Sequence, residues 1–311
     1  MPFDRQFAHV SPTGATLNVY ARSPSGVTRA IIQVNHGLAE HAARYARLAD
    51  ILAGHGYATY AHDHRGHGQT HAADAPRGVF AAENGAEKVI ADVIAVRDRI
   101  AEEQPGVPVV LFGHSMGGLI ALNVLLRHHE RYAAAAIWNA NFSAGAAGQL
   151  AQLVLAWERF RLGSDVPSRL LPALTFRAWA KQIPERRTEF DWLSRDPVEV
   201  DKYIADPLCG FDASVSLWRD VFSLVFYGAD DASFTSLPKD YPVAVVGGDK
   251  DPATDGGKAV RTLERRMRAM GFSNLQTTIY EATRHESLNE VNREKVMGDL
   301  ADWLDRTTKA S

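Results

Sequence analysis

A serine at the junction of a predicted strand and a predicted helix is the residue of this chain best placed for chemistry. Residues 113–117 read Gly-His-Ser-Met-Gly, a G-x-S-x-G pattern with Ser115 at its centre. The apolar run 107–112 predicts the strand, and the leucine-rich run 116–127 predicts the helix. A sharp turn between them would expose the serine hydroxyl to a base, and the two glycines let strand and helix approach closely. This context predicts that Ser115 is a nucleophile.

A serine nucleophile needs a base to take its proton, and the base needs an acid to orient it. Where the serine follows a strand and opens a helix, the acid and then the histidine come later in the chain. His285 follows the predicted strand 275–280, and Asp249 and Asp251 both follow the predicted strand 242–247. Ligand sites collect beyond the carboxyl ends of such strands. We predict His285 as the base and favour Asp251 over Asp249 as the acid, because Asp251 lies further beyond the strand end and precedes a proline.

Attack on a carbonyl group also requires N–H donors for the oxygen that becomes negatively charged. The turn after the serine supplies the backbone N–H of Met116. A second donor is expected from the loop after the predicted strand 30–34. That loop, 35–41, reads Asn-His-Gly-Leu-Ala-Glu-His, and its His-Gly pair would let the backbone turn inward. We therefore predict an oxyanion hole formed by the N–H groups of Leu38 and Met116.

The elements that must position these residues alternate between strands and helices, with one long interruption. The predicted strands are 17–21, 30–34, 57–62, 107–112, 133–139, 242–247 and 275–280, and the predicted helices are 41–55, 87–103, 116–127, 257–270 and 286–306. The interruption, 141–240, is rich in Trp and Leu and shows no such alternation. This pattern predicts a mostly parallel α/β sheet with helices on both faces and an inserted helical cap. The predicted division is core 1–140, cap 141–240 and core 241–311.

The composition is that of an ordinary globular protein, with 311 residues, 46% hydrophobic, 23% charged and a formal net charge of −3. A charge near zero without a dense Lys/Arg tract argues against binding to nucleic acid. The single cysteine, Cys209, excludes an intrachain disulfide and suits a reducing compartment. No secretory signal is evident, and no apolar run approaches the roughly 20 residues of a membrane span. We expect a cytoplasmic protein.

Five segments, taken in order, carry a family resemblance. They are the predicted oxyanion segment 36–41 with Arg44-Tyr45, the loop His-Asp-His-Arg-Gly-His-Gly-Gln-Thr at 62–70, the serine turn 113–118, the acid loop 248–252 and the histidine loop 280–286. Together they resemble the monoglyceride lipase / lysophospholipase group of serine α/β-hydrolases. The resemblance implies the α/β-hydrolase fold and the triad Ser115, Asp251 and His285. It also implies a cofactor-free enzyme of lipid metabolism that cleaves carboxylic esters, of monoacylglycerol or lysophospholipid type, through an acyl-enzyme.

Other activities use the same arrangement, namely a short-chain carboxylesterase, a serine aminopeptidase or a thioesterase. An aminopeptidase would need carboxylates in the cap to hold a substrate ammonium group, and Glu185, Glu189 and Asp191 are the candidates. The expected partner is a small-molecule ester or lipid. The apolar segment 150–162 either lines an acyl pocket from inside the cap, which we favour, or touches a membrane surface.

One histidine-rich segment invites a metal interpretation. His62, His64, His67 and His71 surround a glycine-rich loop that also contains Asp63. No second cluster of ligands is evident in the sequence, and the resemblance makes these histidines packing residues near the site entrance. We predict no metal site.

Overall fold

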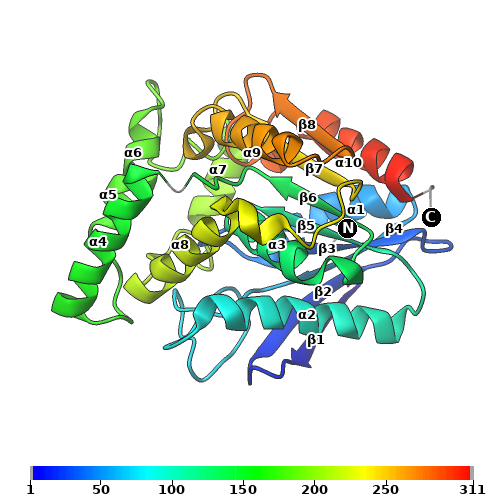
Figure 1. Cartoon of the computed structure of the whole chain (residues 1–311), viewed down its shortest axis with the longest axis horizontal. Coiled ribbons are helices and arrows are strands. Elements are labelled where there is room, and N and C mark those ends of the chain that lie inside the picture. The colour runs from blue at the N-terminus through cyan, green and yellow to red at the C-terminus, as the bar shows by residue number, and fades with distance from the viewer. Residues whose placement is uncertain (1–2, 144, 309–311) are drawn as a thin grey trace.

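The computed structural model describes residues 3–143 and 145–308. Its centre is an eight-stranded sheet with the order β1-β2-β4-β3-β5-β6-β7-β8 (Figure 1). All neighbouring strands from β4 to β8 are parallel, whereas β1 and β2 run antiparallel at one edge. The strands are β1 Arg5–Val10, β2 Thr16–Arg22, β3 Ala30–Asn35, β4 Tyr57–His62, β5 Val109–His114, β6 Ala134–Trp138, β7 Val243–Gly248 and β8 Leu275–Tyr280.

Helices cover both faces of the sheet, which is why the central strands are apolar on both sides. Every residue of β3 to β7 is buried. One apolar core joins a sheet face to α1 and α10, and the other joins the opposite face to α2, α3, α8 and α9. The bounds are α1 Ala46–Gly54, α2 Gly85–Glu103, α3 Met116–His128, α8 Val215–Ala229, α9 Lys258–Ala269 and α10 Arg293–Thr308. This is the α/β-hydrolase fold, so the predicted fold class is confirmed.

The long segment between β6 and β7 is helical. It contains α4 Ala146–Leu162, α5 Leu171–Leu174, α6 Phe176–Lys181, α7 Pro197–Ala205 and α8. In Figure 1, α4, α5 and α6 stand together at one end of the molecule. The last helix, α8, packs on α2 and α3 of a helix layer of the sheet and also on α4, so it joins the insertion to the core. The division into core 1–140, cap 141–240 and core 241–311 stays a prediction.

Two local expectations differ from the structure. The predicted helix 286–306 begins only at Arg293, because the carboxylates of Glu286 and Glu290 bind groups on other segments and hold the preceding residues as a loop. The edge strand β1 was not predicted, since most of its residues are exposed and it has no apolar run. Within the described part of the chain, no helix has both the length and the apolar character needed to cross a membrane.

Candidate active site

Ser115 occupies a sharp turn between β5 and α3. Its backbone has φ 55° and ψ −119°, a region that a residue with a side chain rarely adopts. The turn closes tightly, since a Cβ atom on Gly113 would lie 2.1 Å from the carbonyl oxygen of Gly117. Only glycine fits at such a contact. The serine N–H donates to the carbonyl oxygen of Trp138 at 2.8 Å, which fixes the turn against β6.

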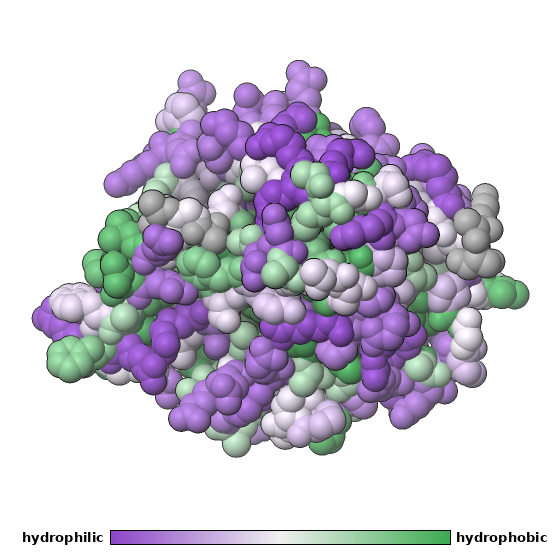
Figure 2. All heavy atoms as spheres, viewed as in Figure 1, coloured by the Kyte–Doolittle hydropathy of each residue, from purple (hydrophilic) through white to green (hydrophobic). Residues whose placement is uncertain are grey.

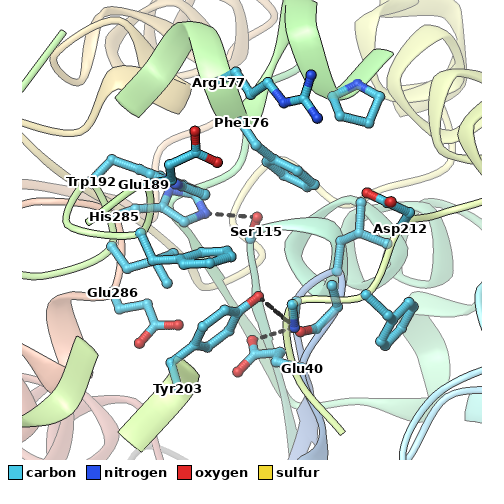
Figure 3. Close-up of a pocket in the computed structure, with 18 of the residues that line it drawn as sticks. Glu40, Ser115, Phe176, Arg177, Glu189, Trp192, Tyr203, Asp212, His285 and Glu286 are labelled. Atoms are coloured by element: carbon cyan, nitrogen blue, oxygen red, sulfur yellow. Dashed lines mark hydrogen bonds between the residues drawn. The ribbon is translucent and has the colours of Figure 1, made fainter. Parts of the chain in front are cut away.

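The structure brings the three predicted triad side chains together, and Figure 3 shows His285 beside Ser115. His285 Nε2 lies 2.8 Å from Ser115 Oγ, and His285 Nδ1 lies 2.9 Å from Asp251 Oδ1. With its proton on Nδ1, the imidazole donates to the carboxylate and leaves Nε2 free to accept the serine proton. His285 is 3% exposed and Asp251 is fully buried, so little water competes for these hydrogen bonds. The arrangement has the geometry of an activated serine nucleophile.

Asp251 is held as a carboxylate by several donors. Its Oδ2 accepts from Asn139 Nδ2 and from Thr254 Oγ1, each at 2.9 Å, and its Oδ1 also accepts from the N–H of Ala253 at 2.9 Å. Burial alone would raise the pKa of Asp251, but the charge of His285 and these hydrogen bonds outweigh it and lower the pKa below 3.8. The rival acid Asp249 lies elsewhere, with Oδ1 3.4 Å from the N–H of Thr283.

The loop that carries Leu38 is fixed by a buried charge network. Glu40 Oε1 accepts from the N–H of Gly37 at 2.6 Å and from Tyr45 Oη at 2.9 Å. Arg44 donates to both Glu40 and Glu286, at 2.6 Å in each case. Burial opposes ionisation of Glu40, yet Arg44 and the neighbouring histidines hold its pKa well below 4.5. The network ties the predicted oxyanion loop to the residue that follows the catalytic histidine candidate.

The predicted role of Leu38 requires a backbone N–H group that is not already hydrogen-bonded. Among the hydrogen bonds of residues 3–143 and 145–308, none uses the Leu38 N–H as a donor. Met116 is the first residue of α3, where backbone N–H groups have no carbonyl partner within the helix. Both residues line a cavity that also contains Ser115. Free donors beside the serine are what an oxyanion hole requires.

Segments of the insertion are hydrogen-bonded directly to these loops. Tyr203 Oη and the N–H of Gly210 both donate to the carbonyl oxygen of Ala39, each at 2.9 Å. The N–H of Glu286 donates to the carbonyl oxygen of Leu193 at 2.7 Å. The residues between α6 and α8 therefore form a fixed wall of the site.

Two chambers meet at Ser115 and His285. The polar chamber has a volume of about 240 Å³, and the side chains that give it its character are Glu40, Arg177, Glu189, Tyr203, Asp212 and Glu286. The apolar chamber has a volume of about 390 Å³, and its walls include Leu119, Leu171, Leu174, Trp179, Trp218 and Phe222. Phe176 lines both chambers and lies above the serine in Figure 3. A molecule bound at Ser115 therefore meets different chemistry on its two sides.

The three carboxylates considered for an aminopeptidase are not placed together. Glu189 lines the polar chamber. Asp191 instead accepts from the N–H of Arg187 at 2.5 Å and from Thr188 Oγ1 at 2.6 Å. Glu185 is exposed and lines neither chamber.

The histidine-rich segment is a buried packing cluster. His62 and His64 are fully buried with rings 4.7 Å apart, and His36 lies 4.4 Å from His64. Burial lowers the pKa of His62 to about 3 and that of His36 to about 4, so both rings are neutral at pH 7. His71 is exposed.

A group outside this segment has ligand atoms close enough to share a metal ion. His41, Asp206 and Cys209 have such atoms within 4.8 Å of one another. His41 Nε2 and Asp206 Oδ2 are already paired at 2.8 Å. Burial also raises the pKa of the Cys209 thiol, which opposes the thiolate that a metal needs. The chemistry of this group does not favour a metal, and it takes no part in the serine arrangement.

Sequence reasoning did not assign several residues that shape the site. Arg44 and Glu286 lay within the segments quoted for the resemblance, but their pairing across the chain has no local signal. Asn139 follows β6 and has a left-handed backbone conformation, with φ 49°. From this position its side chain donates a hydrogen bond to Asp251. Tyr203, Arg177 and Asp212 lie in the insertion, where the sequence offered no motif.

Known proteins resemble this chain in sequence and in fold. A family model described as "Serine aminopeptidase, S33" matches residues 26–292. The monoglyceride lipase of Homo sapiens is 29% identical over 291 residues, covering 92% of this chain and 85% of that protein. The monoacylglycerol lipase of Mycolicibacterium smegmatis is 25% identical over 303 residues, covering 97% and 96%. The structure of a thermostable carboxyl esterase from Bacillus coagulans, bound to glycerol, superposes with a TM-score of 0.89 at 22% identity and covers 99% of each chain.

Proposed function

Because this chain belongs to the serine aminopeptidase S33 family and is a carboxylic ester hydrolase, we propose that it cleaves monoacylglycerol-type or lysophospholipid-type esters through an acyl-enzyme on Ser115. The observation that carries the proposal is the hydrogen-bonded chain from Asp251 through His285 to Ser115 Oγ, with distances of 2.9 and 2.8 Å. It stands where the two chambers meet. The names of the human and mycobacterial relatives support the substrate class.

Acylation begins when Ser115 Oγ attacks the ester carbonyl carbon and gives its proton to His285 Nε2. Asp251 keeps the proton on Nδ1 and stabilises the imidazolium that forms. The N–H groups of Leu38 and Met116 bind the carbonyl oxygen as it becomes negative. The bond to the leaving alcohol then breaks, and His285 Nε2 returns the proton to the alcohol oxygen.

Deacylation repeats the sequence with water. His285 Nε2 takes a proton from water, whose oxygen attacks the acyl carbon on Ser115. The tetrahedral species collapses, the bond to Ser115 Oγ breaks, and the serine recovers its proton from His285. The products are a carboxylic acid and an alcohol, and no cofactor enters the reaction.

The two chambers assign the two halves of the ester. The aliphatic and aromatic walls of the apolar chamber suit an acyl chain, whose burial is favourable by about 0.8 kcal/mol per CH₂. The charged and hydroxyl groups of the polar chamber suit the alcohol half. A volume of about 390 Å³ favours a medium or long acyl chain over acetate. The alternative is a short-chain carboxylesterase. The dependence of the hydrolysis rate on acyl-chain length distinguishes the two.

The insertion also offers a surface for a lipid interface. Leu155 of α4 is fully buried, but Leu153 is 69% and Phe160 is 91% exposed. Figure 2 shows hydrophobic side chains at the end of the molecule where α4 lies. We propose that this outer face touches lipid surfaces while the inner face of α4 lines the apolar chamber. A cytoplasmic location, which the single Cys209 suits, also stays a proposal.

The test is hydrolysis of monoacylglycerols and p-nitrophenyl esters over a series of acyl lengths. Wild type should cleave them with an optimum at medium or long chains, and Ser115→Ala should lose at least about a thousandfold in kcat. Ser273→Ala, at an exposed serine beyond α9, is the matched control and should behave as wild type. A fluorophosphonate should label wild type and Ser273→Ala but not Ser115→Ala. Near-wild-type turnover by Ser115→Ala would refute the mechanism.

A further inference from the structure

The polar chamber carries charges that ester hydrolysis itself does not use. Glu40 and Glu286 are neutralised in part by Arg44. Arg177, Glu189 and Asp212 differ, because none of their side chains makes a hydrogen bond or an ion pair with another residue in the described part of the chain. They come from α6, from the loop after it and from the loop before α8. Three segments of the insertion thus present unpaired charges to one cavity.

The close-up view shows how these groups surround the reacting atoms (Figure 3). Glu189 lies on the side of His285, Asp212 lies on the opposite side of the cavity, and Arg177 lies between them above Phe176. All three side chains are exposed, so solvent hydrates them when no ligand is bound. The reacting serine is below them. Whatever leaves from Ser115 into this chamber passes one guanidinium flanked by two carboxylates.

We propose that the polar chamber selects a leaving alcohol with a zwitterionic head group, a phosphodiester linked to an alkylammonium. This inference rests on the proposed function, and it names the substrate within it. Arg177 would pair with the phosphate through a planar, bidentate fork. Glu189 and Asp212 would face the ammonium. The preferred substrate is therefore a lysophospholipid of phosphocholine or phosphoethanolamine type.

Other head groups leave charges of the chamber unused or opposed. An anionic phosphate monoester would satisfy Arg177 but would face the unpaired carboxylates Glu189 and Asp212. A simple cationic alcohol would meet those carboxylates but would be repelled by Arg177. Glycerol would make hydrogen bonds to either group without using their charge. Only a head group that carries both a negative and a positive charge can pair with all three residues. Like charges brought together repel each other, so the chamber should disfavour the other head groups.

The walls add two features that suit the same ligand. Phe190 lies beside Tyr203, with ring centroids 5.3 Å apart, and both rings line the polar chamber. Aromatic faces attract alkylammonium groups, and Phe190 is the ring of this pair that carries no cation in the described structure, since the Arg44 guanidinium already lies 4.9 Å from the Tyr203 centroid. Trp192 is 5% exposed and lines the chamber, yet its indole N–H has no acceptor among the described residues. A buried donor of this kind calls for an oxygen atom from a ligand or from water.

The experiment compares head groups on one acyl chain. Wild type is assayed for kcat/KM on lauroyl esters of glycerol, glycerophosphocholine, glycerophosphoethanolamine and glycerol phosphate, all below their micellar concentrations. We expect the two zwitterionic esters to exceed the glycerol ester and the anionic ester by about tenfold, as a few exposed charge contacts and one cation–π contact allow. The decisive readout is the ratio of kcat/KM for the zwitterionic ester to that for the glycerol ester.

Three variants then locate the selectivity. Glu189→Gln with Asp212→Asn should lower that ratio by about tenfold, and Arg177→Gln should lower it severalfold. Glu185→Gln is the matched control, because Glu185 is exposed beside the same loop but lines neither chamber, and it should leave the ratio unchanged.

The outcomes separate this inference from the proposed function. A wild type that prefers the glycerol or the anionic ester, or variants whose ratio does not move, would overturn the inference while leaving serine ester hydrolysis intact. Absence of Ser115-dependent hydrolysis on every ester would overturn both. A preference for the choline ester over the ethanolamine ester would identify the quaternary ammonium as the source of recognition, and equal rates would identify the charge alone.

Discussion

The reacting centre and the insertion that covers it differ in whether their polar side chains have hydrogen-bond partners. Around Ser115, the side chains of the predicted triad are hydrogen-bonded to one another, and Asp251 accepts hydrogen bonds from His285, Asn139, Thr254 and Ala253. In the insertion, charged side chains face the polar chamber unpaired, and large apolar side chains of α4 face solvent. The hydrogen bonds of the centre fix the geometry needed for one reaction. The charged and apolar side chains of the insertion remain available to contact a bound molecule.

The comparison teaches where stability and specificity reside. Buried hydrogen-bonded charges are costly to alter, since removal of one partner leaves the others without compensation. Exposed unpaired charges contribute little to folding, so they can differ without loss of the fold. The predicted effects of substitution should therefore fall steeply from the centre to the outer face of α4.

The largest effect should follow from a change that leaves the shape of the centre intact. Asp251→Asn keeps the size of the side chain but can donate to His285 Nδ1, which would place the imidazole proton on Nε2 and block acceptance from Ser115. We expect kcat to fall by about 10⁴-fold, as a wrong histidine tautomer produces in serine enzymes. Steady-state kinetics on the preferred ester measure the loss.

Asp249→Asn is the matched control for this prediction. Asp249 lies on the same loop, but its carboxylate contacts the N–H of Thr283 and not the histidine. It should retain activity within a few-fold. Equal losses in the two variants would show that the loop, and not the orientation of His285, limits the reaction.

The second prediction concerns how the free energy of unfolding depends on pH, through the buried histidines of the core beside the centre. Burial lowers the pKa of His62 to about 3 from its ordinary 6.5, and it lowers the pKa of His67 in the same way. Between pH 6.5 and about pH 3, these histidines bind protons in the unfolded chain but not in the folded chain. The free energy of unfolding therefore falls as pH is lowered. Each such histidine contributes a slope of about 1.4 kcal/mol per pH unit, and its full stability is present only above pH 6.5.

Urea unfolding of wild type and His62→Phe from pH 7.5 to 5 would measure this slope. The variant should lose less stability on acidification, with a slope smaller by about one proton. His71→Phe, at the exposed histidine of the same loop, should follow wild type. If His62→Phe does not fold, His67→Phe tests the same point. Parallel curves for wild type and a folded variant would show that these rings titrate normally in the folded protein.

Much of the centre could be predicted because its signals are local in the sequence. The turn at Ser115 is defined by two glycines, an apolar strand and an apolar helix, the Asp251 loop follows the apolar strand β7, and the His285 loop follows the last strand, β8. The α/β-hydrolase fold follows from the same alternation. The roles of these residues stay predictions, although the structure places their side chains in contact.

The remainder depends on contacts between distant segments. Arg44 meets Glu286 across a sequence separation of 242 residues, and no local pattern encodes that pair. The edge strand β1 lacks an apolar run. The residues before α10 could extend that helix, but hydrogen bonds of their glutamates to other segments keep them out of it. Arg177, Glu189 and Asp212 become neighbours only through the folding of the insertion. Of these three, only Glu189 was named from the sequence, as a carboxylate of the insertion; no motif pointed to Arg177 or Asp212.

The smallest effect on folding should come from the outer face of α4. Leu153→Ser and Phe160→Ser replace side chains that are 69% and 91% exposed, so the free energy of unfolding should change by no more than about 0.5 kcal/mol. Hydrolysis of an emulsified monoacylglycerol should nevertheless fall severalfold relative to hydrolysis of a dispersed short-chain ester, because apolar area that enters the lipid interface is lost. Val27→Ser, at a residue 89% exposed but distant in the sequence, should leave that ratio unchanged. A similar fall in both assays would mean that α4 acts on the apolar chamber from behind, and the outer face would then have no role at a lipid surface.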